Sequence, residues 1–572
     1  MNHIYRSIWN ATLGCWMAAP ETACEGCASC RNVRSRVEPR LVGMPSTWTV
    51  LAAALFLWLG GMEAVCAQTI NVLGNENKSV PTDYSAGPYS GGSIAKGGTL
   101  TVNAGNTLTL NSGFTLNNSG TLNINGALNN AGEIKGTVQG LQPSAVIRND
   151  SGGKIIASSA HGIDLKAGGL VSNIGSGSVI QTSGGFGKAA VYIDGAAGTV
   201  NNLSGASINS TSYLGNGVFL GLGGAVLNDG IGSSISAKGG GVGIQGRVGR
   251  VDNTGGARIT SDGVFGVQLE AGGTVLNHGQ GSTISAAGTL STGVNFLNSS
   301  GSLVNTEGAV INTLGKGRLG VNLGQGGSVF NGEGSSIYGT FASVQSSGNT
   351  TLTNAGNLFG DVDLNATSQN EVHLWSGAQI KGDLKIGSNA ASTLTLEGSG
   401  QQLYSDAVSG VTTFAGVLRM AGTGRWVLDQ VLNSVNTIID SGTLEVAHNN
   451  ALGSGEVNVG DTGTLQVNSG FTLENELNLS AGGTLSGTGT VGIASSPTTV
   501  ESGAAIRGGD SDTTYGTLTV AGNLDMKAGA ILQVRVDPSS NQASLVNVVG
   551  TATLTGSTVQ HVGNVVNAAS DF

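Results

Sequence analysis

A serine in a glycine-rich loop is the first residue of this chain that could carry chemistry. Asn149-Asp150-Ser151-Gly152-Gly153 presents a hydroxyl as a nucleophile of acyl transfer would. Such a serine needs a histidine base and an aspartate, which in the chymotrypsin order both precede it. After the leader the first histidine is His161, downstream of the serine. We therefore interpret this motif as a glycine-rich turn.

Metal ligands are the second kind of residue to consider, and their spacing is unfavourable. The histidines after residue 67 are scattered and do not pair at metal-ligand spacing: His161, His278, His373, His448 and His561. Cys24-x-x-Cys27-x-x-Cys30 has thiolate spacing, but it lies in a leader that we expect to be removed. The segment 508–512 (GGDSD) resembles a calcium-binding repeat but occurs once. We expect no metal and no cofactor.

Acidic residues could serve a polysaccharide-degrading enzyme if they clustered with Arg or Lys on neighbouring strands. The candidates are Asp164, Asp194, Asp252, Asp262 and Glu270. They are dispersed along the sequence without a basic partner set. We therefore expect a protein that is not an enzyme, with a hydrolase or lyase as the less favoured reading.

The composition favours many short strands. Glycine accounts for 97 of 572 residues, 39% are hydrophobic and only 10% are charged. Val, Ile and Leu alternate with Ser, Thr, Asn and Gly, as strands joined by tight turns require. The net charge of −10 shows no basic stripe, so nucleic acid is not an expected partner. All five cysteines precede residue 68, which excludes a disulfide framework after it.

The N-terminal segment has the pattern of a Sec-type signal peptide. A basic stretch precedes an apolar run over residues 50–59, and small residues follow at Val65-Cys66-Ala67. The run is about half the ~20 residues that span a bilayer, so a permanent anchor is not expected. We predict passage through the Sec machinery and cleavage between Ala67 and Gln68.

A repeat dominates the middle of the chain. An asparagine recurs every 24 to 29 residues, each followed by an Ile and then by an aliphatic pair. The asparagines are Asn149, Asn173, Asn202, Asn228, Asn253, Asn277, Asn305 and Asn331. The length variation falls between the Ile and the aliphatic pair, which indicates two rigid corners and one loop that accepts insertions.

Three apolar segments per repeat predict three strands per coil. We therefore predict an all-β fold, a right-handed single-stranded parallel β-helix (β-solenoid) with roughly 24–29 residues per coil. Each asparagine is expected to occupy a left-handed corner, and the stacked amides to bond along the axis. A β-sandwich array is the structural alternative, but it would need hairpins at shorter spacing.

The predicted organisation has five parts. Residues 1–67 form the extended signal peptide, and residues 68–145 an N-terminal cap with short-period coils. Residues 146–400 form the β-helix repeat region. Residues 401–562 form C-terminal coils, and 563–572 an irregular tail.

The leader resembles the extended signal peptide region of autotransporters, the type V secreted proteins. The residues that carry the likeness are Met1, Asn2, Ile4, Tyr5, Arg6, Ile8, Trp9, Asn10, Gly14, Trp16, Ala18, Glu21 and Ala23. Residues 422–426 (GTGRW), 441–446 (SGTLEV) and 450–453 (NALG) are similar to the passenger-associated transport repeat. Residues 482–491 and 516–523 are similar to the last coils of pertactin-like passengers, an autochaperone-like region.

This resemblance implies an exported passenger that acts as a cell-surface adhesin or as an aggregation or virulence factor. Its partners would be host cells, matrix or other copies of itself. The sequence departs from the family because no outer-membrane β-barrel domain follows before Phe572. We expect that the barrel is supplied by another chain or lost, the alternative being a truncated or pseudogene product. With a barrel the product is expected at the cell surface, outer membrane or outside the cell, and without one in the periplasm.

Overall fold

The computed structural model describes residues 5–10, 15–20, 70–80, 84–86, 91–313, 318–537, 540 and 542–563. The chain divides into two compact units, Met1–Val65 and Cys66–Phe572. In the first unit, β1 (Tyr5–Asn10) pairs antiparallel with β2 (Cys15–Pro20). The cysteine motif at 24–30, the apolar run and the cleavage position Ala67/Gln68 lie outside the described residues.

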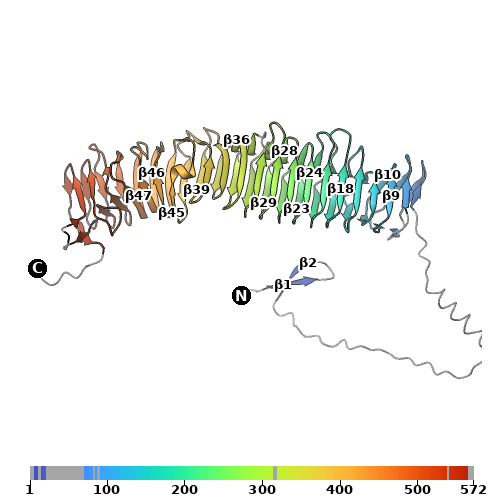
Figure 1. Ribbon diagram of the computed structural model, residues 1–572, viewed down its shortest axis with the longest axis horizontal. Coiled ribbons are helices and arrows are strands. Elements are labelled where there is room, and N and C mark those ends of the chain that lie inside the picture. Colours follow the sequence, from blue (N-terminus) through green and yellow to red (C-terminus); the bar gives the residue numbers. More distant parts are fainter. Residues whose placement is uncertain are drawn as a thin grey trace, which may run out of the picture. The chain divides into compact units, whose positions relative to one another are not determined.

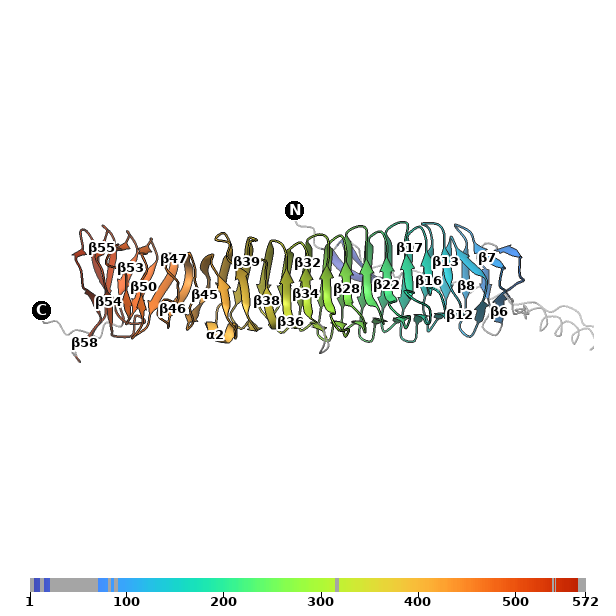
Figure 2. The ribbon, with the colours of Figure 1, turned by 90° about the horizontal axis from the view of Figure 1, so that it is seen from above.

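The second unit is a parallel β-solenoid of about 20 turns, as predicted (Figure 1). One coil consists of β20 (Gly198–Leu203), β21 (Ser207–Ser210) and β22 (Asn216–Leu220). The next coil consists of β23 (Gly224–Asp229), β24 (Ser234–Ala237) and β25 (Gly240–Ile244). Each strand pairs in parallel with its counterpart one coil away. Seen from above, the coils follow one another along a single axis (Figure 2).

The interior is filled by columns of identical or similar side chains. Alternate residues of each strand point inward, so one apolar position per strand is stacked over its counterpart in the next coil. Three such columns include Val200, Val226 and Val251; Ile208, Ile235 and Ile259; and Val218, Val242 and Val267. All of these side chains are at most 1% exposed. Burial of the columns is the main source of stability for every coil.

Coil length varies along the solenoid. Paired residues are 24 apart at Ile147 and Val171 (171 − 147) and 29 apart at Val171 and Val200 (200 − 171). Towards both ends the coils are shorter: Leu108 pairs with Leu128, 20 residues away (128 − 108). In the C-terminal part the strands fuse into long bent ones, β45 (Val417–Leu428), β46 (Asn436–Val446) and β47 (Glu456–Val467). A coil that replaces a corner with a bend needs fewer residues, which explains the shorter period there.

The repeated asparagines form a buried ladder along the axis. The Nδ2 of each donates to the Oδ1 of the asparagine in the next coil, at 2.7–2.9 Å, from Asn130 to Asn354. The predicted axial bonding is therefore confirmed. The ladder ends where the next coils carry Leu110 at one side and Leu374 at the other.

The left-handed corner predicted for these asparagines was wrong, because none of them has a positive φ. They are strand residues that point inward, where stacked amides satisfy each other. The left-handed residue lies two positions later, for example Ser151 (φ 52), Ser204 (φ 57) and Glu307 (φ 56). The amide also donates across this corner, as Asn202 does to the carbonyl of Ala206 at 3.0 Å. This bridge explains why the corner has a fixed length.

A buried polar cluster and a tryptophan lie in the segment that resembles the transport repeat. Arg425 forms an ion pair with Glu445, whose side chain is only 7% exposed and which also accepts from Asn468 Nδ2. Trp426 is fully buried, and its Nε1 donates to the carbonyl of Glu397 at 2.9 Å. These contacts join β45, β46 and β47 across three coils.

Candidate binding surface

The insertion-tolerant connections between the second and third strand of successive coils form one edge of the solenoid, which we call the loop edge. It comprises residues 158–162, 183–190, 211–215, 238–239, 262–264 and 287–291. The predicted loop of variable length is therefore confirmed. Large apolar side chains project from it, including Phe186 (68% exposed), Tyr213 (66%), Leu290 (67%) and Val264. Apolar exposure repeated from coil to coil is typical of an interaction surface.

Two leucines of the loop edge hold an unfavourable backbone conformation. Leu214 has a φ of 54° and Leu290 a φ of 137°, and both side chains are exposed. A positive φ is strained for any residue with a Cβ and is natural for glycine. Strain that is kept at exposed apolar residues is typical of functional loops.

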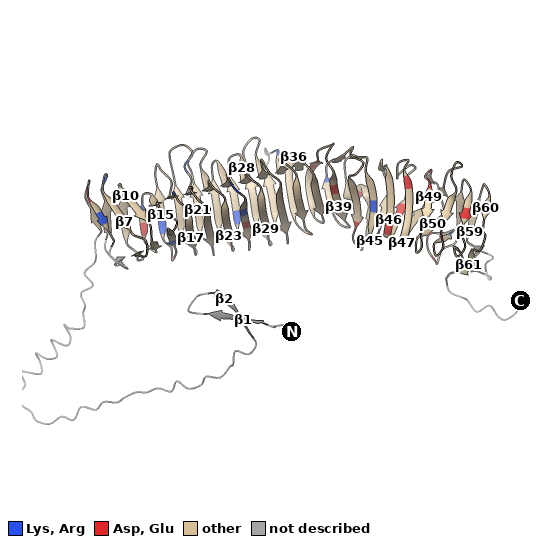
Figure 3. Ribbon diagram, turned by 180° about the vertical axis from the view of Figure 1, so that it is seen from behind, with Lys and Arg blue, Asp and Glu red and all other residues tan. Residues whose placement is uncertain are grey.

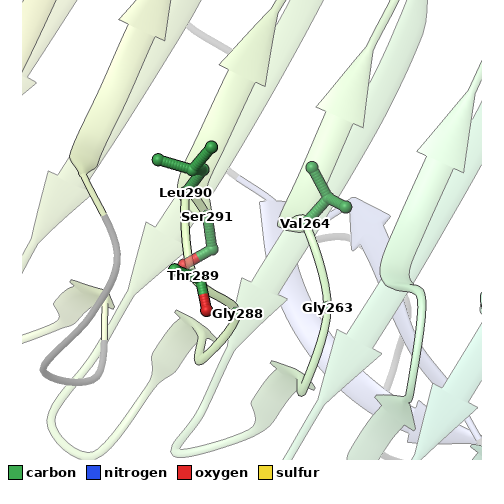
Figure 4. Close-up of a pocket in the computed structure, with 6 residues that line it drawn as sticks. All are labelled: Gly263, Val264, Gly288, Thr289, Leu290 and Ser291. Carbon is green, nitrogen blue, oxygen red and sulfur yellow. The ribbon is translucent and has the colours of Figure 1, made fainter.

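Each of these leucines borders a shallow pocket. Leu290 and Val264 flank a pocket of about 270 Å³ with Gly263, Gly288, Thr289 and Ser291 (Figure 4). A second pocket of about 220 Å³ is lined by Gly187, Ala189, Tyr192, Leu214, Asn216 and Phe219. Both are smaller than the ~300–1,000 Å³ of pockets that enclose a drug-sized ligand. They suit shallow contacts made at several coils.

Beside the loop edge, the outward-facing residues of the third strands stand in register, and we call them the outward row. The strands are β16 (Ile163–Leu165), β19 (Val191–Ile193), β22, β25, β28 (Phe265–Leu269), β31 (Thr292–Phe296) and β34 (Leu319–Leu323). The row consists of Asp164, Tyr192, Phe219, Gly243, Gln268, Asn295 and Asn322. It presents two aromatic rings, a gap at glycine and then three amides.

The aromatic part of the row is stacked. The rings of Tyr192 and Phe219 lie 5.3 Å apart at an interplanar angle of 8°. On the adjoining loops, Phe186 and Tyr213 repeat this arrangement with ring centroids 5.7 Å apart. His161 lies on the other side of Tyr192, with centroids 4.5 Å apart. Aromatic side chains from three successive coils therefore meet at one place.

Charged groups surround Tyr192. Lys166 Nζ lies 2.8 Å from Asp164 Oδ1 and 4.8 Å from the centre of the Tyr192 ring. The Tyr192 hydroxyl donates to Asp194 Oδ2 at 3.3 Å. The sequence interpretation that Asp164 and Asp194 are dispersed without a basic partner was wrong, because the coil period brings both next to Lys166. By contrast, Asp252 pairs with Arg250 at 2.8 Å two coils away.

The environment shifts three pKa values. Burial opposes the charged form of Lys166, but the hydrogen bond and charge of Asp164 outweigh it, so the pKa is raised. The pKa of Tyr192 is raised by burial and by the neighbouring Asp194 carboxylate. The pKa of His161 is lowered because burial disfavours the imidazolium more than Asp164 favours it. At neutral pH, Lys166 is charged, while Tyr192 and His161 are neutral.

The other residues considered from the sequence lie elsewhere. Ser151 lies in the turn between β14 (Val146–Asn149) and β15 (Lys154–Ala157). His278 lies 3.3 Å from Glu307, and His373 Nδ1 lies 2.7 Å from Glu397. Within the described ranges, no three His, Cys, Asp or Glu side chains are grouped as a metal site. Charged residues are sparse over the coils (Figure 3).

Sequence reasoning missed Tyr192, Phe219 and the apolar loop residues. A signal was present, since Tyr192 and Phe219 each follow the first valine of an aliphatic pair, 27 residues apart (219 − 192). Phe186 and Tyr213 have the same spacing (213 − 186). Aromatic residues at the period of the repeat predict stacking on one surface.

Residues 1–49 match the family model described as the extended signal peptide of the type V secretion system. No curated protein matches the chain. None of the helices in the described part of the chain has the length and apolar character needed to cross a membrane. A type V leader followed by a parallel β-solenoid fits an autotransporter passenger, and it implies export.

Proposed function

We propose that this exported passenger is an adhesin or aggregation factor that acts at the cell surface or outside the cell. The observation that carries the proposal is the loop edge, where exposed apolar side chains recur on successive coils beside the outward row. Its partners are host cells, extracellular matrix or further copies of the protein.

A repetitive surface suits adhesion because weak contacts add up. Each pocket is shallow and offers one or two apolar anchors, so a single contact is weak. Several contacts on one rigid support act together, and avidity can then exceed single-site affinity by about 10²–10⁴. A rigid solenoid also loses little conformational entropy when it binds.

We favour binding over catalysis for the charged group at Tyr192. The raised pKa keeps Lys166 as an ammonium ion, so it cannot act as the base of a lyase at neutral pH. The ion pair with Asp164 also occupies the carboxylate that an acid or nucleophile would need. The group therefore serves to orient Tyr192 at the surface.

Adhesion is tested with the exported chain that begins at Gln68. Beads coated with it are added to host cells and to immobilised matrix proteins, and self-association is followed by sedimentation. A triple variant with serine at Phe186, Tyr213 and Leu290 is expected to lose most of the adhesion.

The matched control places serine at Ile231 and Val248, which are exposed apolar residues at other corners of the coils (87% and 68%). It is expected to adhere like the unaltered chain. The proposal is wrong if the unaltered chain binds neither cells nor matrix nor itself. Equal adhesion of the loop-edge variant would exclude this edge as the adhesive surface.

A further inference from the structure

The outward row combines two surfaces that a sugar chain needs. A pyranose has an apolar face of C–H groups and a rim of hydroxyl groups. Aromatic rings complement the face, and amides complement the rim because each offers two N–H donors and two acceptor lone pairs. In this protein the two surfaces follow each other along one strand position.

The aromatic surface has an open position next to Phe219. The following coil carries Gly243 in register, so no side chain stacks on the face of Phe219 turned away from Tyr192. A Cβ at Gly243 would lie 3.5 Å from Phe219 Cδ2, 3.7 Å from Phe265 Cζ and 2.8 Å from Asn216 Nδ2. Two aromatic rings and an amide thus border a place that a side chain fills in the other coils of the row.

The amide surface continues from this position. Asn295 Nδ2 donates to Gln268 Oε1 at 3.1 Å, and Asn322 Nδ2 donates to Asn295 Oδ1 at 2.8 Å. These bonds use one N–H of each donor and leave further donors and acceptors directed to solvent. Successive coils are ~4.8 Å apart, which is close to the length of one sugar unit. A linear oligosaccharide along the axis would meet one row residue per unit.

Charge narrows the class of sugar. The row is neutral from Tyr192 to Asn322, and its first position is the Asp164 carboxylate, with Asp194 close by. The one nearby cation, Lys166, is already paired with Asp164. Uronic acids or sulfate groups would meet repulsion at this end without a free cation to compensate.

We propose that the outward row binds a neutral glycan of the surface to which the protein adheres, with one sugar ring packed on Phe219 beside Gly243 and the following units on the amides of Gln268, Asn295 and Asn322. This assignment rests on the adhesive function proposed above and names its ligand class. The apolar loop edge forms the wall of the same site through Leu214 and Ala189.

The test is calorimetric titration of the exported chain with hexasaccharides of glucose, of N-acetylglucosamine and of heparin. At least one neutral hexasaccharide is expected to bind saturably, and the heparin hexasaccharide is not. Phe219→Ala and Tyr192→Ala are each expected to weaken binding roughly tenfold. Circular dichroism verifies that the variants keep the β-solenoid.

The matched control is Tyr338→Ala. Tyr338 and Phe359 form a second stacked pair, 4.2 Å apart at 1°, on strands β36 (Ser336–Ser346) and β38 (Asn357–Asp363) outside the outward row. This variant is expected to bind like the unaltered chain.

Three results would overturn the assignment: no neutral hexasaccharide binds, heparin binds best, or Phe219→Ala and Tyr338→Ala have equal effects. If the unaltered chain adheres to cells and the Phe219→Ala chain adheres equally, the glycan site is wrong while the adhesive function stands. If the chain binds a hexasaccharide but adheres to nothing, the adhesive function is wrong instead.

Discussion

Replacing Asn253 by alanine removes one link from the buried asparagine ladder. The Asn253 side chain accepts from Asn228 Nδ2 at 2.8 Å and donates to Asn277 Oδ1 at 2.8 Å. It also donates to the carbonyl of Ala257 at 3.0 Å, across the following corner. The three asparagines are all fully buried, so water cannot replace the lost bonds.

The cost follows from which partners stay unsatisfied. Asn228 Nδ2 keeps a bond to the carbonyl of Arg258 at 3.0 Å, whereas Asn277 Oδ1 loses its ladder donor. A buried polar atom left unpaired costs ~1–3 kcal/mol, and the cavity left by the amide adds ~1 kcal/mol. We expect Asn253→Ala to lower the local free energy of unfolding by about 3 kcal/mol. Asn253→Asp preserves the shape but directs a carboxylate at these oxygens, so it is expected to cost more at neutral pH and to recover on acidification.

Hydrogen exchange followed by mass spectrometry is the appropriate assay, because a solenoid can open coil by coil and need not unfold in two states. Peptides from coils 249–283 report the local opening. The matched control is Asn322→Ala, an outward, half-exposed asparagine whose amide donates to Asn295 at 2.8 Å. It is expected to cost less than ~0.5 kcal/mol. Equal costs for the two variants would refute the argument that burial makes the ladder stabilising.

Three further predictions concern other parts of the chain. Because burial lowers the pKa of His161 from 6.5, its stabilising contribution is present above that pH and is lost as the pH falls through it; the denaturant midpoint of His161→Gln should vary less than that of the unaltered chain between about pH 7.5 and about pH 5. Arg425→Met leaves the buried Glu445 carboxylate without its cation and should lower the unfolding free energy by about 2 kcal/mol in denaturant titration, an effect that Arg425→Lys should partly recover; no loss with Met would contradict a stabilising pair. Mass spectrometry of the exported protein should find Gln68 at its N-terminus, and Ala67→Arg should block this cleavage; a different first residue would exclude the predicted site.

The sequence by itself determined the export route and the fold class. The leader pattern was recognisable because targeting signals are linear, and its likeness to the type V extension is confirmed by the family model. The period of Asn, Ile and Val predicted the coils, since stacked coils repeat the same inward positions at every turn. The cleavage site at Ala67/Gln68 and the absence of catalysis stay predictions.

Only the tertiary structure decided which surface residues are neighbours. Connections as short as 238–239 and as long as 183–190 join the second and third strands, so equal distances in sequence do not imply contact. The ladder register places Tyr192 against Phe219 and leaves the open position at Gly243. It also places Asp194 beside Lys166, which composition and spacing had not suggested. Inward positions obey one rule because they all meet the same dry interior, whereas outward positions are free to differ, and their meaning depends on which coil lies next to them.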